Sequence, residues 1–561
     1  HRIARRQRQM CIRDRMKGLR FLLLFPLIGF SQAEASHWYF GNGAGLIFDV
    51  NAGTVTSTNA ASGTINTSEG CSSISDLNGN LLFYTDGRNI WDKNHTIMPN
   101  ANYAAGTGLM GDPSSTSSGL IIPKPGNSDQ YYVFTVDEPH HQNAYAFPNQ
   151  GPANAAGNPV GTYDSGGSVP NADDGFNNGL AYTLVDLSLN AGDGDVVTSE
   201  KNIQLTTYDP SIQSQNSYKC SEKITAVEHS DGQSYWVVTH FRDRFYSFRV
   251  EASGVNTTAV VTTTTTLISE LGYRRNAIGY MKASPDGTKI ALCHRQNGTA
   301  QGQNSNNTGS VMLYDFDNAT GLVSNPTNLY PNSGPYGVEF SQESTKLYVT
   351  ANQSVIQFDL EAANPAQTIN TVYNGFDFIG ALQLGPDGKI YVANTDNYAT
   401  MDVINAPDEA GVLCDYTYAG ITLAPGTTGV IGLPPFIQSF FLASIVFENA
   451  CVNQSTLFDV NSSQDFDSIL WTFGDGTGTS NENSPSYTYT SAGTYTVTAE
   501  ITSGTEVNTF AETIVISENP IANPILDIDV CDEDGIVSFD FGGPESQILG
   551  TQNPVSFNVK Y

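Results

Sequence analysis

A short turn-plus-strand phrase recurs along this chain, and it limits the folds that the chain can adopt. "SPDGTKIAL" begins at Ser284, and "GPDGKIYVA" begins at Gly385. Pro-Asp-Gly is turn chemistry, because Pro presets φ and Gly accepts the positive φ of a tight turn. The residues that follow are strand formers. Each phrase therefore predicts a tight turn that leads into a β-strand.

Further copies show that the phrase belongs to an array. Copies of this shape begin at Ser75, Pro125, Ser230, Ser284, Ser341 and Gly385. A short apolar strand precedes most copies, and another strand follows most of them. A four-stranded unit of about 40–50 residues that is repeated six or more times is typical of a β-propeller. The fold class that we predict is all-β, and the repetition is architectural.

The two ends of the array are incomplete in complementary ways. Residues 37–50 supply two strands without an inner strand before them, and residues 434–441 supply an inner strand without a continuation. One blade built from both ends would protect edges that otherwise lie open. We therefore predict a seven-bladed propeller over residues 37–445 that is closed by both ends. An insertion at about residues 141–178 leaves room for an eighth blade, so six to eight blades are allowed.

The N-terminal segment has the pattern of an exported protein. Residues 1–15 are rich in Arg, unlike the rest of the chain, and look like a non-native upstream segment. Residues 16–32 combine a basic head, an apolar run and a small-residue exit, which predicts a secretory signal peptide rather than a buried strand. The apolar stretch 431–447 contains two prolines and several polar residues, so we predict a buried strand pair there. No membrane-spanning segment is expected after signal removal.

Charge and cysteine content limit the partners and the metal sites. Without residues 1–32 the chain has 17 basic and 55 acidic residues, a net charge of −38. Such a surface repels nucleic acid and anionic lipid and suits a secreted protein on the outer cell surface. Six cysteines remain after residue 32, which permits disulfides in an exported chain but fixes no pairing. The cysteines lie too far apart in sequence for a zinc site of the paired-cysteine type.

A second module follows the propeller. Residues 446–518 contain Trp471, Phe473, the turn 474–476 (Gly-Asp-Gly) and a later strand with Gly493, Tyr495 and Val497. This stretch of about 75 residues resembles the PKD domain family, which implies an Ig-like sandwich that serves as a spacer or binding module outside the cell. Tyr487 stands where the family commonly has His. A core role for Trp471 is favoured over a role as a ligand platform.

The last 43 residues, 519–561, look like the start of a further β module. Four acidic residues on one turn are weak Ca²⁺ candidates, with a solvated acidic turn as the favoured alternative; they are Asp527, Asp529, Asp532 and Asp534. The order of signal peptide, propeller and PKD domain resembles secreted surface proteins of Bacteroidetes that end in a gliding-motility-associated or type IX sorting domain. That resemblance implies a chain truncated at its C-terminus. No cofactor other than Ca²⁺ is expected.

Polar residues that follow the repeated phrase are the candidate ligand site. In a propeller, the loop after the second strand of each blade opens on the same face as the loops between blades, so these residues should gather on one rim. They are Asp86, Arg88, His140, His141, His240, Arg242, His294, Arg295, Asn352, Asn394 and Asp396. Such a set fits a polar or anionic ligand, or a metal held by His140, His141 and a carboxylate. Ordinary solvated loops are the alternative.

Two functions remain open from the sequence. The first is a cell-surface adhesion protein whose propeller binds an extracellular glycan or a surface protein, with the PKD module as a spacer. The second is a hydrolase or lyase of extracellular polysaccharide that uses rim histidines and carboxylates. The chain contains no Gly-x-Ser-x-Gly, His-Glu-x-x-His or phosphate-binding Gly-Lys-Ser/Thr motif. We therefore expect a protein that is not an enzyme and predict no catalytic residues.

Overall fold

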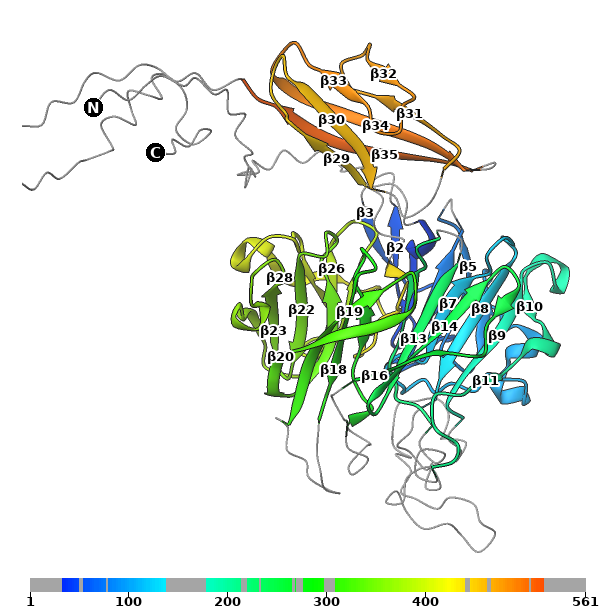
Figure 1. Cartoon of the computed structure of the whole chain (residues 1–561). Coiled ribbons are helices and arrows are strands. Elements are labelled where there is room, and N and C mark those ends of the chain that lie inside the picture. The colour runs from blue at the N-terminus through cyan, green and yellow to red at the C-terminus, as the bar shows by residue number, and fades with distance from the viewer. Residues whose placement is uncertain are drawn as a thin grey trace, which may run out of the picture. The chain divides into compact units, whose positions relative to one another are not determined.

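The computed structural model describes residues 33–49, 54–76, 79–137, 178–212, 219–231, 234–264, 268, 276–296, 308–438, 444–461, 466–503 and 506–518. These residues fall into two compact units that meet in sequence at about residue 444. Their regular elements are β-strands and short 3-10 helices, as Figure 1 shows. The all-β prediction is confirmed.

The first unit contains seven antiparallel sheets among its described residues, in chain order. The first sheet consists of β1 (His37–Phe40), β2 (Ala44–Asp49) and β3 (Thr54–Thr58), and the second of β4 (Ser72–Ser75), β5 (Leu81–Thr85) and β6 (Ile90–Asp92). The third sheet consists of β7 (Gly119–Pro123), β8 (Gln130–Val136), β9 (Leu180–Asp186), β10 (Asp195–Val196) and β11 (Ile203–Leu205). The fourth consists of β12 (Ile224–Glu228), β13 (Tyr235–Phe241), β14 (Arg244–Glu251), β15 (Gly254–Val255) and β16 (Val260–Thr263).

The last three sheets of this unit have four strands each, in sequential order. They consist of β17 (Met281–Ala283), β18 (Lys289–His294), β19 (Gly309–Asp317) and β20 (Leu322–Ser333); of β21 (Pro335–Phe340), β22 (Lys346–Ala351), β23 (Ser354–Asp359) and β24 (Asn370–Asn374); and of β25 (Ile379–Leu384), β26 (Ile390–Asn394), β27 (Thr400–Ile404) and β28 (Tyr416–Thr422). The 3-10 helices are η1 (Ala33–Ala35), η2 (Pro99–Ala101), η3 (Tyr103–Ala105), η4 (Asn190–Gly192), η5 (Thr198–Glu200), η6 (Pro365–Gln367) and η7 (Gly411–Cys414).

The sheets are arranged as the blades of a β-propeller, which we count from β4–β6 as the first blade to β25–β28 as the sixth, with the sheet β1–β3 counted last. The first strands of successive sheets contact one another from β4 through β7, β12, β17 and β21 to β25. Neighbouring blades thereby cover the apolar faces that one sheet cannot bury alone. The strands β12, β22 and β26 are buried along their whole length. The exact number of blades stays a prediction, because the insertion that could hold an eighth blade lies outside the described residues.

The repeated turns have the predicted chemistry. Gly287 and Gly388 adopt φ values of 65° and 71°, which a residue with a Cβ adopts only with strain. The amide of Gly287 donates to the carbonyl of Ser284 at 2.9 Å, and that of Gly388 donates to the carbonyl of Gly385 at 3.0 Å. The turn predicted from Pro-Asp-Gly is therefore confirmed in both copies, and each turn joins the first and second strands of a blade.

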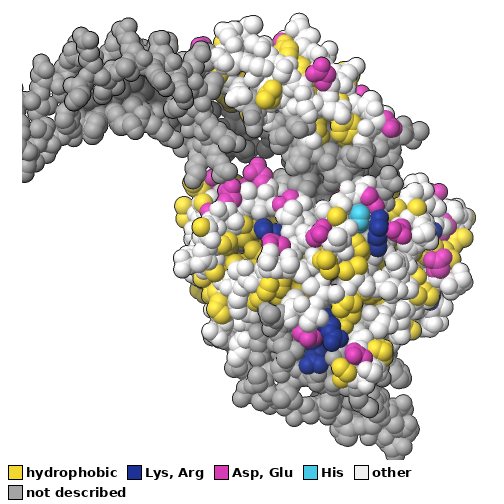
Figure 2. All heavy atoms as spheres, in the orientation of Figure 1, with side chains coloured by type: hydrophobic (Ala, Val, Ile, Leu, Met, Phe, Trp, Pro, Cys, Tyr) yellow, Lys and Arg dark blue, Asp and Glu magenta, His cyan; other side chains and the backbone are white. Residues whose placement is uncertain are grey.

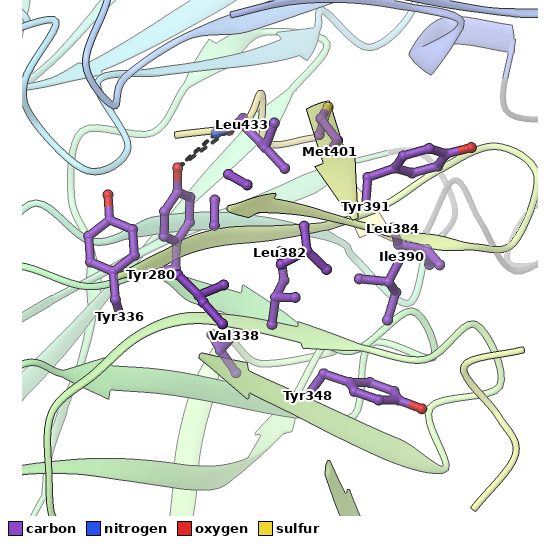
Figure 3. Packing of buried hydrophobic residues seen from close by; sticks show 14 of the residues in the cluster. Tyr280, Tyr336, Val338, Tyr348, Leu382, Leu384, Ile390, Tyr391, Met401 and Leu433 are labelled. Atoms are coloured by element: carbon purple, nitrogen blue, oxygen red, sulfur yellow. Dashed lines mark hydrogen bonds between the residues drawn. The ribbon is translucent and has the colours of Figure 1, made fainter. Parts of the chain in front are cut away.

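The two ends of the propeller unit meet. Asn42, which follows β1, and Thr428 exchange backbone hydrogen bonds of 2.9 and 3.3 Å. The Trp38 and Phe436 rings lie 5.8 Å apart. The carbonyl of Ile431 accepts a hydrogen bond from the amide of Ala381, and the amide of Ile431 donates to the carbonyl of Ser68. The C-terminal segment therefore runs between strand β25 of the sixth blade and the residues before β4. Tyr280 hydrogen-bonds to Leu433 with its hydroxyl (Figure 3).

One part of the closure prediction is wrong. Residues 434–438 are buried but form no strand, whereas an inner strand was predicted over residues 434–441. The physical reason is local, because Pro434 and Pro435 have no amide to donate to a sheet. Residues 439–443 lie outside the described part of the chain. The strand pair predicted for 431–447 is thus reduced to β29 (Ser444–Glu448), which belongs to the second unit.

A polar group of side chains lies beside this C-terminal segment, and we name it the closing cluster: Lys282, Glu339, Gln383 and Gln438. All four are buried. Lys282 forms an ion pair of 3.0 Å with Glu339 and donates a hydrogen bond to Gln383. Gln438 donates to Glu339 at 3.3 Å. The amides of Phe340 and Leu384 also donate to Glu339, so both of its carboxylate oxygens are satisfied.

The second unit is a sandwich of two sheets. One sheet contains β29, β30 (Ser455–Asn461) and β33 (Ser486–Thr488), and the other contains β31 (Ser468–Thr472), β32 (Thr479–Ser480), β34 (Gly493–Ser503) and β35 (Glu506–Ile516). Trp471 is fully buried, and its indole N–H donates to the carbonyl of Glu482. Tyr487 stacks on Phe473 with ring centroids 4.1 Å apart. The core role predicted for Trp471 is confirmed.

Several predictions concern residues outside this description. The N-terminal segments 1–15 and 16–32, the further module 519–561 and the four Ca²⁺ candidates all fall there. Five cysteines are described: Cys71, Cys293 and Cys414 are buried free thiols, Cys220 is also buried, and Cys451 is partly exposed. Within the described ranges, no helix has the length and apolar character needed to cross a membrane.

Candidate functional site

The candidate site residues share one end of the propeller, which we call the rim face. There the first strand of a blade starts and the second strand ends, because the two strands are antiparallel. The second strands β5, β13, β18, β22 and β26 end at or just before the described candidates. His140 and His141 lie outside the described residues. The described candidates lie on the same face of the propeller but do not form one site. They separate into three groups.

The first group, Asp86 and Arg88, closes a turn. Asp86 is buried and accepts hydrogen bonds from the amides of Arg88 and Asn89 at 2.9 and 2.6 Å. Arg88 forms a buried ion pair with Asp112. Its guanidinium lies 4.7 Å from the centre of the Tyr103 ring. Burial raises the pKa of Asp86, and these hydrogen bonds oppose the rise. Both side chains lie on the rim face but are buried and engaged within this turn, so the alternative of an ordinary solvated loop does not describe them.

The second group lies on the fifth and sixth blades. Asn352 adopts a φ of 55°, and its carbonyl accepts from the amide of Ile379 at 2.9 Å. Asn394 is buried, donates to Asp402 at 2.6 Å and accepts from the amide of Asp396. Asp396 accepts from the amide of Phe376 with one carboxylate oxygen. Its other oxygen is buried without a hydrogen-bond partner among the described residues.

The third group centres on two histidines from neighbouring blades. His240 is the penultimate residue of β13 and His294 ends β18, and their ring centroids are 5.2 Å apart. Their exposed fractions are 1% and 0%, so the alternative of ordinary solvated loops does not describe these two side chains. Nε2 of His240 and both ring nitrogens of His294 have no hydrogen-bond partner among the described residues. Unsatisfied buried groups of this kind need an explanation.

Lys223, which the sequence analysis missed, lies next to these histidines. Its ammonium donates to the carbonyls of Asn276, Ala277 and Ile278. Burial lowers its pKa to about 7, and the neighbouring charges of Glu222 and Cys293 oppose the shift. The adjacent Glu222 accepts from the amide and hydroxyl of Thr116, so it is tied to another blade. The pattern Glu-Lys directly before an apolar strand was the available signal.

The electrostatics keep both imidazoles neutral at ordinary pH. Burial, and then the charge of Lys223, lower the pKa of His240 to about 3. The same causes hold the pKa of His294 well below its ordinary value. A neutral imidazole has one donor and one acceptor nitrogen. We name Lys223, His240 and His294 the open cluster, because it offers hydrogen-bonding atoms that nothing in the described chain uses.

Two arginines lie near the open cluster in sequence and on the same face. Arg242 follows β13 with a φ of 57°. Arg295 follows His294, and its guanidinium lies 4.6 Å from the centre of the Phe378 ring, on the approach to the sixth blade. Among the described residues, no group of three or more histidines, cysteines and carboxylates is arranged to hold a metal ion. Arginine, lysine and imidazole donors together fit a polar or anionic ligand.

Comparison with known proteins identifies the second unit. A family model described as PKD domain matches residues 443–517. The PKD1 domain of the Vibrio cholerae metalloprotease PrtV is 32% identical over 13% of this chain and 93% of its own length, with a TM-score of 0.12. Residues 443–517 are therefore a PKD domain. No curated protein sequence matches the chain significantly.

The propeller unit is similar to solved propeller structures only at low identity. A 6-phosphogluconolactonase-like protein from Bacteroides uniformis is 10% identical over 71% of this chain and 98% of its own, with a TM-score of 0.36. The Cps50 (Swd1) β-propeller domain of Myceliophteria thermophila is 11% identical over 65% and 91%, also with a TM-score of 0.36. No argument about activity rests on these two likenesses.

Proposed function

We propose that this chain is a binding protein of the outer cell surface, whose propeller holds an extracellular ligand at the open cluster. The observation that carries the proposal is the set of three buried ring nitrogens of His240 and His294 that have no hydrogen-bond partner in the described part of the chain. Leaving a buried polar atom unsatisfied costs about 1–3 kcal/mol, which a ligand donor or acceptor would recover. The cluster also lies on the rim face, where loops of several blades meet.

The PKD domain supports the extracellular part of the proposal. PKD domains are typical of extracellular proteins, and the sequence begins with a pattern of export. Trp471 is enclosed in the sandwich core, which leaves this domain the role of a spacer. The resemblance to Bacteroidetes surface proteins adds export by type IX secretion and a link to gliding motility as part of the same proposal.

We propose binding without turnover. General acid or base catalysis is most efficient when the pKa of the group lies near the working pH. The pKa of His240 lies near 3, and that of His294 is also strongly lowered, so neither exchanges protons readily at neutral pH. This electrostatic setting does not favour the polysaccharide hydrolase or lyase that the sequence left open.

The test measures binding of the labelled chain to cells and to immobilised extracellular glycans and proteins. The variant His240→Phe/His294→Phe keeps an aromatic ring of somewhat larger volume at each position and removes all four ring nitrogens. We expect it to remain folded and to lose at least tenfold in affinity. The matched control is His229→Gln, since His229 follows β12 at the opposite end of the blade. Full binding by the folded double variant would contradict the proposal.

A further inference from the structure

The outer strands of the fifth and sixth blades carry a group of aromatic side chains that the proposed function does not use. Three tyrosine rings from two different strands are nearly parallel. Tyr373 on β24 stacks on Tyr416 of β28, with centroids 4.5 Å apart and an interplanar angle of 12°. It also faces Tyr418 at 6.0 Å and 17°. We name Tyr373, Tyr416 and Tyr418 the tyrosine platform.

The platform is exposed at one end. Tyr418 exposes 47% of its surface, although it is aromatic and lies on a strand. Figure 2 shows hydrophobic side chains gathered over the part of the propeller that holds β23 and β28. Exposed apolar side chains that cluster in this way mark binding surfaces more often than isolated ones do.

A buried aspartate and a bulge hold the platform in place. Asp402 on β27 is fully buried and accepts from the Tyr416 hydroxyl at 2.5 Å and from the Ala419 amide at 2.8 Å. Met401 pairs with Ile421 but Val403 pairs with Thr417, so residues 418–420 all lie opposite Asp402. Ala419 has a strained φ of 51°. Bulges re-aim side chains at functional positions, and here the bulge carries Tyr418.

Asp396 supplies an unused acceptor beside the tyrosines. Burial raises the pKa of Tyr373 and of Tyr416, and the charge of Asp402 is the next largest cause. The charge of Asp396 raises both pKa values further, which shows that Asp396 lies close to these rings. One of its oxygens accepts from the Phe376 amide at 3.0 Å, whereas Oδ1 is buried without a partner in the described chain. A hydroxyl or amino donor of a ligand would satisfy this oxygen.

Phe376 presents a further ring in the loop that is hydrogen-bonded to Asp396. Its side chain is 92% exposed, yet both of its backbone groups are held. The amide donates to Asp396, and the carbonyl accepts from the Gln353 side chain at 2.8 Å. A Cβ at the preceding Gly375 would come within 2.8 Å of the Asp396 carboxylate, so the loop packs tightly against it. A phenyl ring on a held backbone is a pre-organised contact rather than a mobile one.

We propose that Tyr418, Phe376 and Asp396 form a saccharide-binding site, with the tyrosine platform as its stacking surface. A pyranose ring has an apolar C–H face that packs on an aromatic ring and hydroxyls at its edge that donate to carboxylates. This inference rests on the proposed function, in that the propeller binds an extracellular ligand, and it adds a site and a ligand class.

Charge narrows the saccharide further. The chain carries a net charge of −31, and Asp396 adds a carboxylate to the site. A sulfated or uronate-rich glycan would be repelled by this surface. The site therefore fits a neutral glycan or one with amino sugars, whose donors face Asp396 Oδ1.

The test uses the full chain on an array of neutral, amino-sugar and acidic glycans, followed by titration with the best neutral or amino-sugar glycan. Tyr418→Ala and Phe376→Ala should each lower the affinity at least tenfold. Tyr418→Phe keeps the ring and should bind as the parent does. Leu322→Ala, which changes an exposed apolar residue on β20, is the control for surface hydrophobicity. Melting temperatures of all four variants should stay within about 2 °C of the parent, since the changed side chains are exposed.

Three results would overturn the inference. Undiminished glycan binding by folded Tyr418→Ala and Phe376→Ala would place the saccharide elsewhere. A preference for acidic glycans would contradict the charge argument, and a parent chain that binds no glycan on the array would remove the ligand class. None of these decides the proposed function, which depends on the loss of cell or protein binding in His240→Phe/His294→Phe.

Discussion

Two of the propeller's buried lysines lie in clusters of opposite character. In the closing cluster, Lys282 meets Glu339 at 3.0 Å and the carboxylate is hydrogen-bonded on both oxygens. In the open cluster, the Lys223 ammonium donates to backbone carbonyls, and the two neutral histidines beside it have three ring nitrogens without a partner among the described residues. Both clusters are buried, so burial alone does not separate a structural polar group from a ligand site.

The two clusters differ in how far their polar groups are satisfied. Lys282 and Glu339 pair with each other, and Gln438 Oε1 is the closing cluster's buried atom without a hydrogen-bond partner among the described residues, whereas the open cluster has three such ring nitrogens. A fully satisfied buried network rigidifies a fold, whereas a partly satisfied one leaves free energy to be gained by something else. The closing cluster joins three blades to the C-terminal segment through Gln438, which suits a role in holding the ring shut. The open cluster has hydrogen-bonding capacity left over, which suits a role in binding. The predictions below test this contrast, from the largest expected effect to the smallest.

Removing the carboxylate of the closing cluster should have the largest effect. Glu339→Ala leaves the Lys282 ammonium buried without its partner, and breaking a buried pair in this way costs about 3–5 kcal/mol. The free energy of unfolding, measured by urea titration, should fall by that amount. The double variant Lys282→Met/Glu339→Leu should recover most of the loss. A Glu339→Ala protein as stable as the parent would remove the distinction between the clusters.

The open cluster should make the protein sensitive to acid. The folded pKa of His240 is about 3 against an ordinary 6.5, so the unfolded chain binds the proton more readily between these values. Stability should therefore fall as the pH drops from 6.5 toward 3, by up to about 1.4 kcal/mol per pH unit for this group. Unfolding of His240→Gln/His294→Gln, measured from pH 7 to pH 4, should show a shallower pH dependence. Parallel curves for variant and parent would contradict this expectation.

At neutral pH the open cluster should tolerate substitution. His294→Phe removes two nitrogens that have no partner among the described residues and introduces a somewhat larger apolar ring, so relief of the unsatisfied atoms should largely offset the cost of the added volume. The free energy of unfolding at pH 7.5 should change by about 1 kcal/mol or less. A loss as large as that of Glu339→Ala would show that His294 has a structural partner, and the proposed ligand site would have to be withdrawn.

Removing the PKD domain should have the smallest effect. Every residue of both clusters belongs to the propeller unit. A chain that ends before residue 444 should keep the propeller's melting temperature within about 2 °C, as expected for a separate compact unit. It should also keep the stability difference between Glu339→Ala and His294→Phe. A large loss in either quantity would mean that the two units do not fold independently.

Much of the architecture follows from local chemistry in the sequence. Pro-Asp-Gly at Ser284 and Gly385 specifies a turn because Gly287 and Gly388 accept positive φ. The strand after each turn follows from its β-forming residues. The Trp-x-Phe-Gly-Asp-Gly stretch indicates the PKD core, since Trp471 lies on the buried side of the alternating strand β31 and its large apolar ring is favoured in the interior. These features depend on neighbours a few residues away, which a sequence displays directly.

The role of each polar residue was decided by tertiary structure. Arg88 and Asp112 lie 24 positions apart, and Lys282 and Glu339 lie 57 apart, so no local pattern announces either pair. The sequence placed His240 and His294 on the correct face but left ordinary solvated loops open as the alternative for them. Their burial depends on how adjacent blades pack, and so does the alignment of Tyr373 with Tyr418. By itself the sequence determined which residues form strands and which face of the propeller the strand ends reach. Only the packing of the blades decided which polar groups find hydrogen-bond partners, because those partners come from strands that are distant in the sequence.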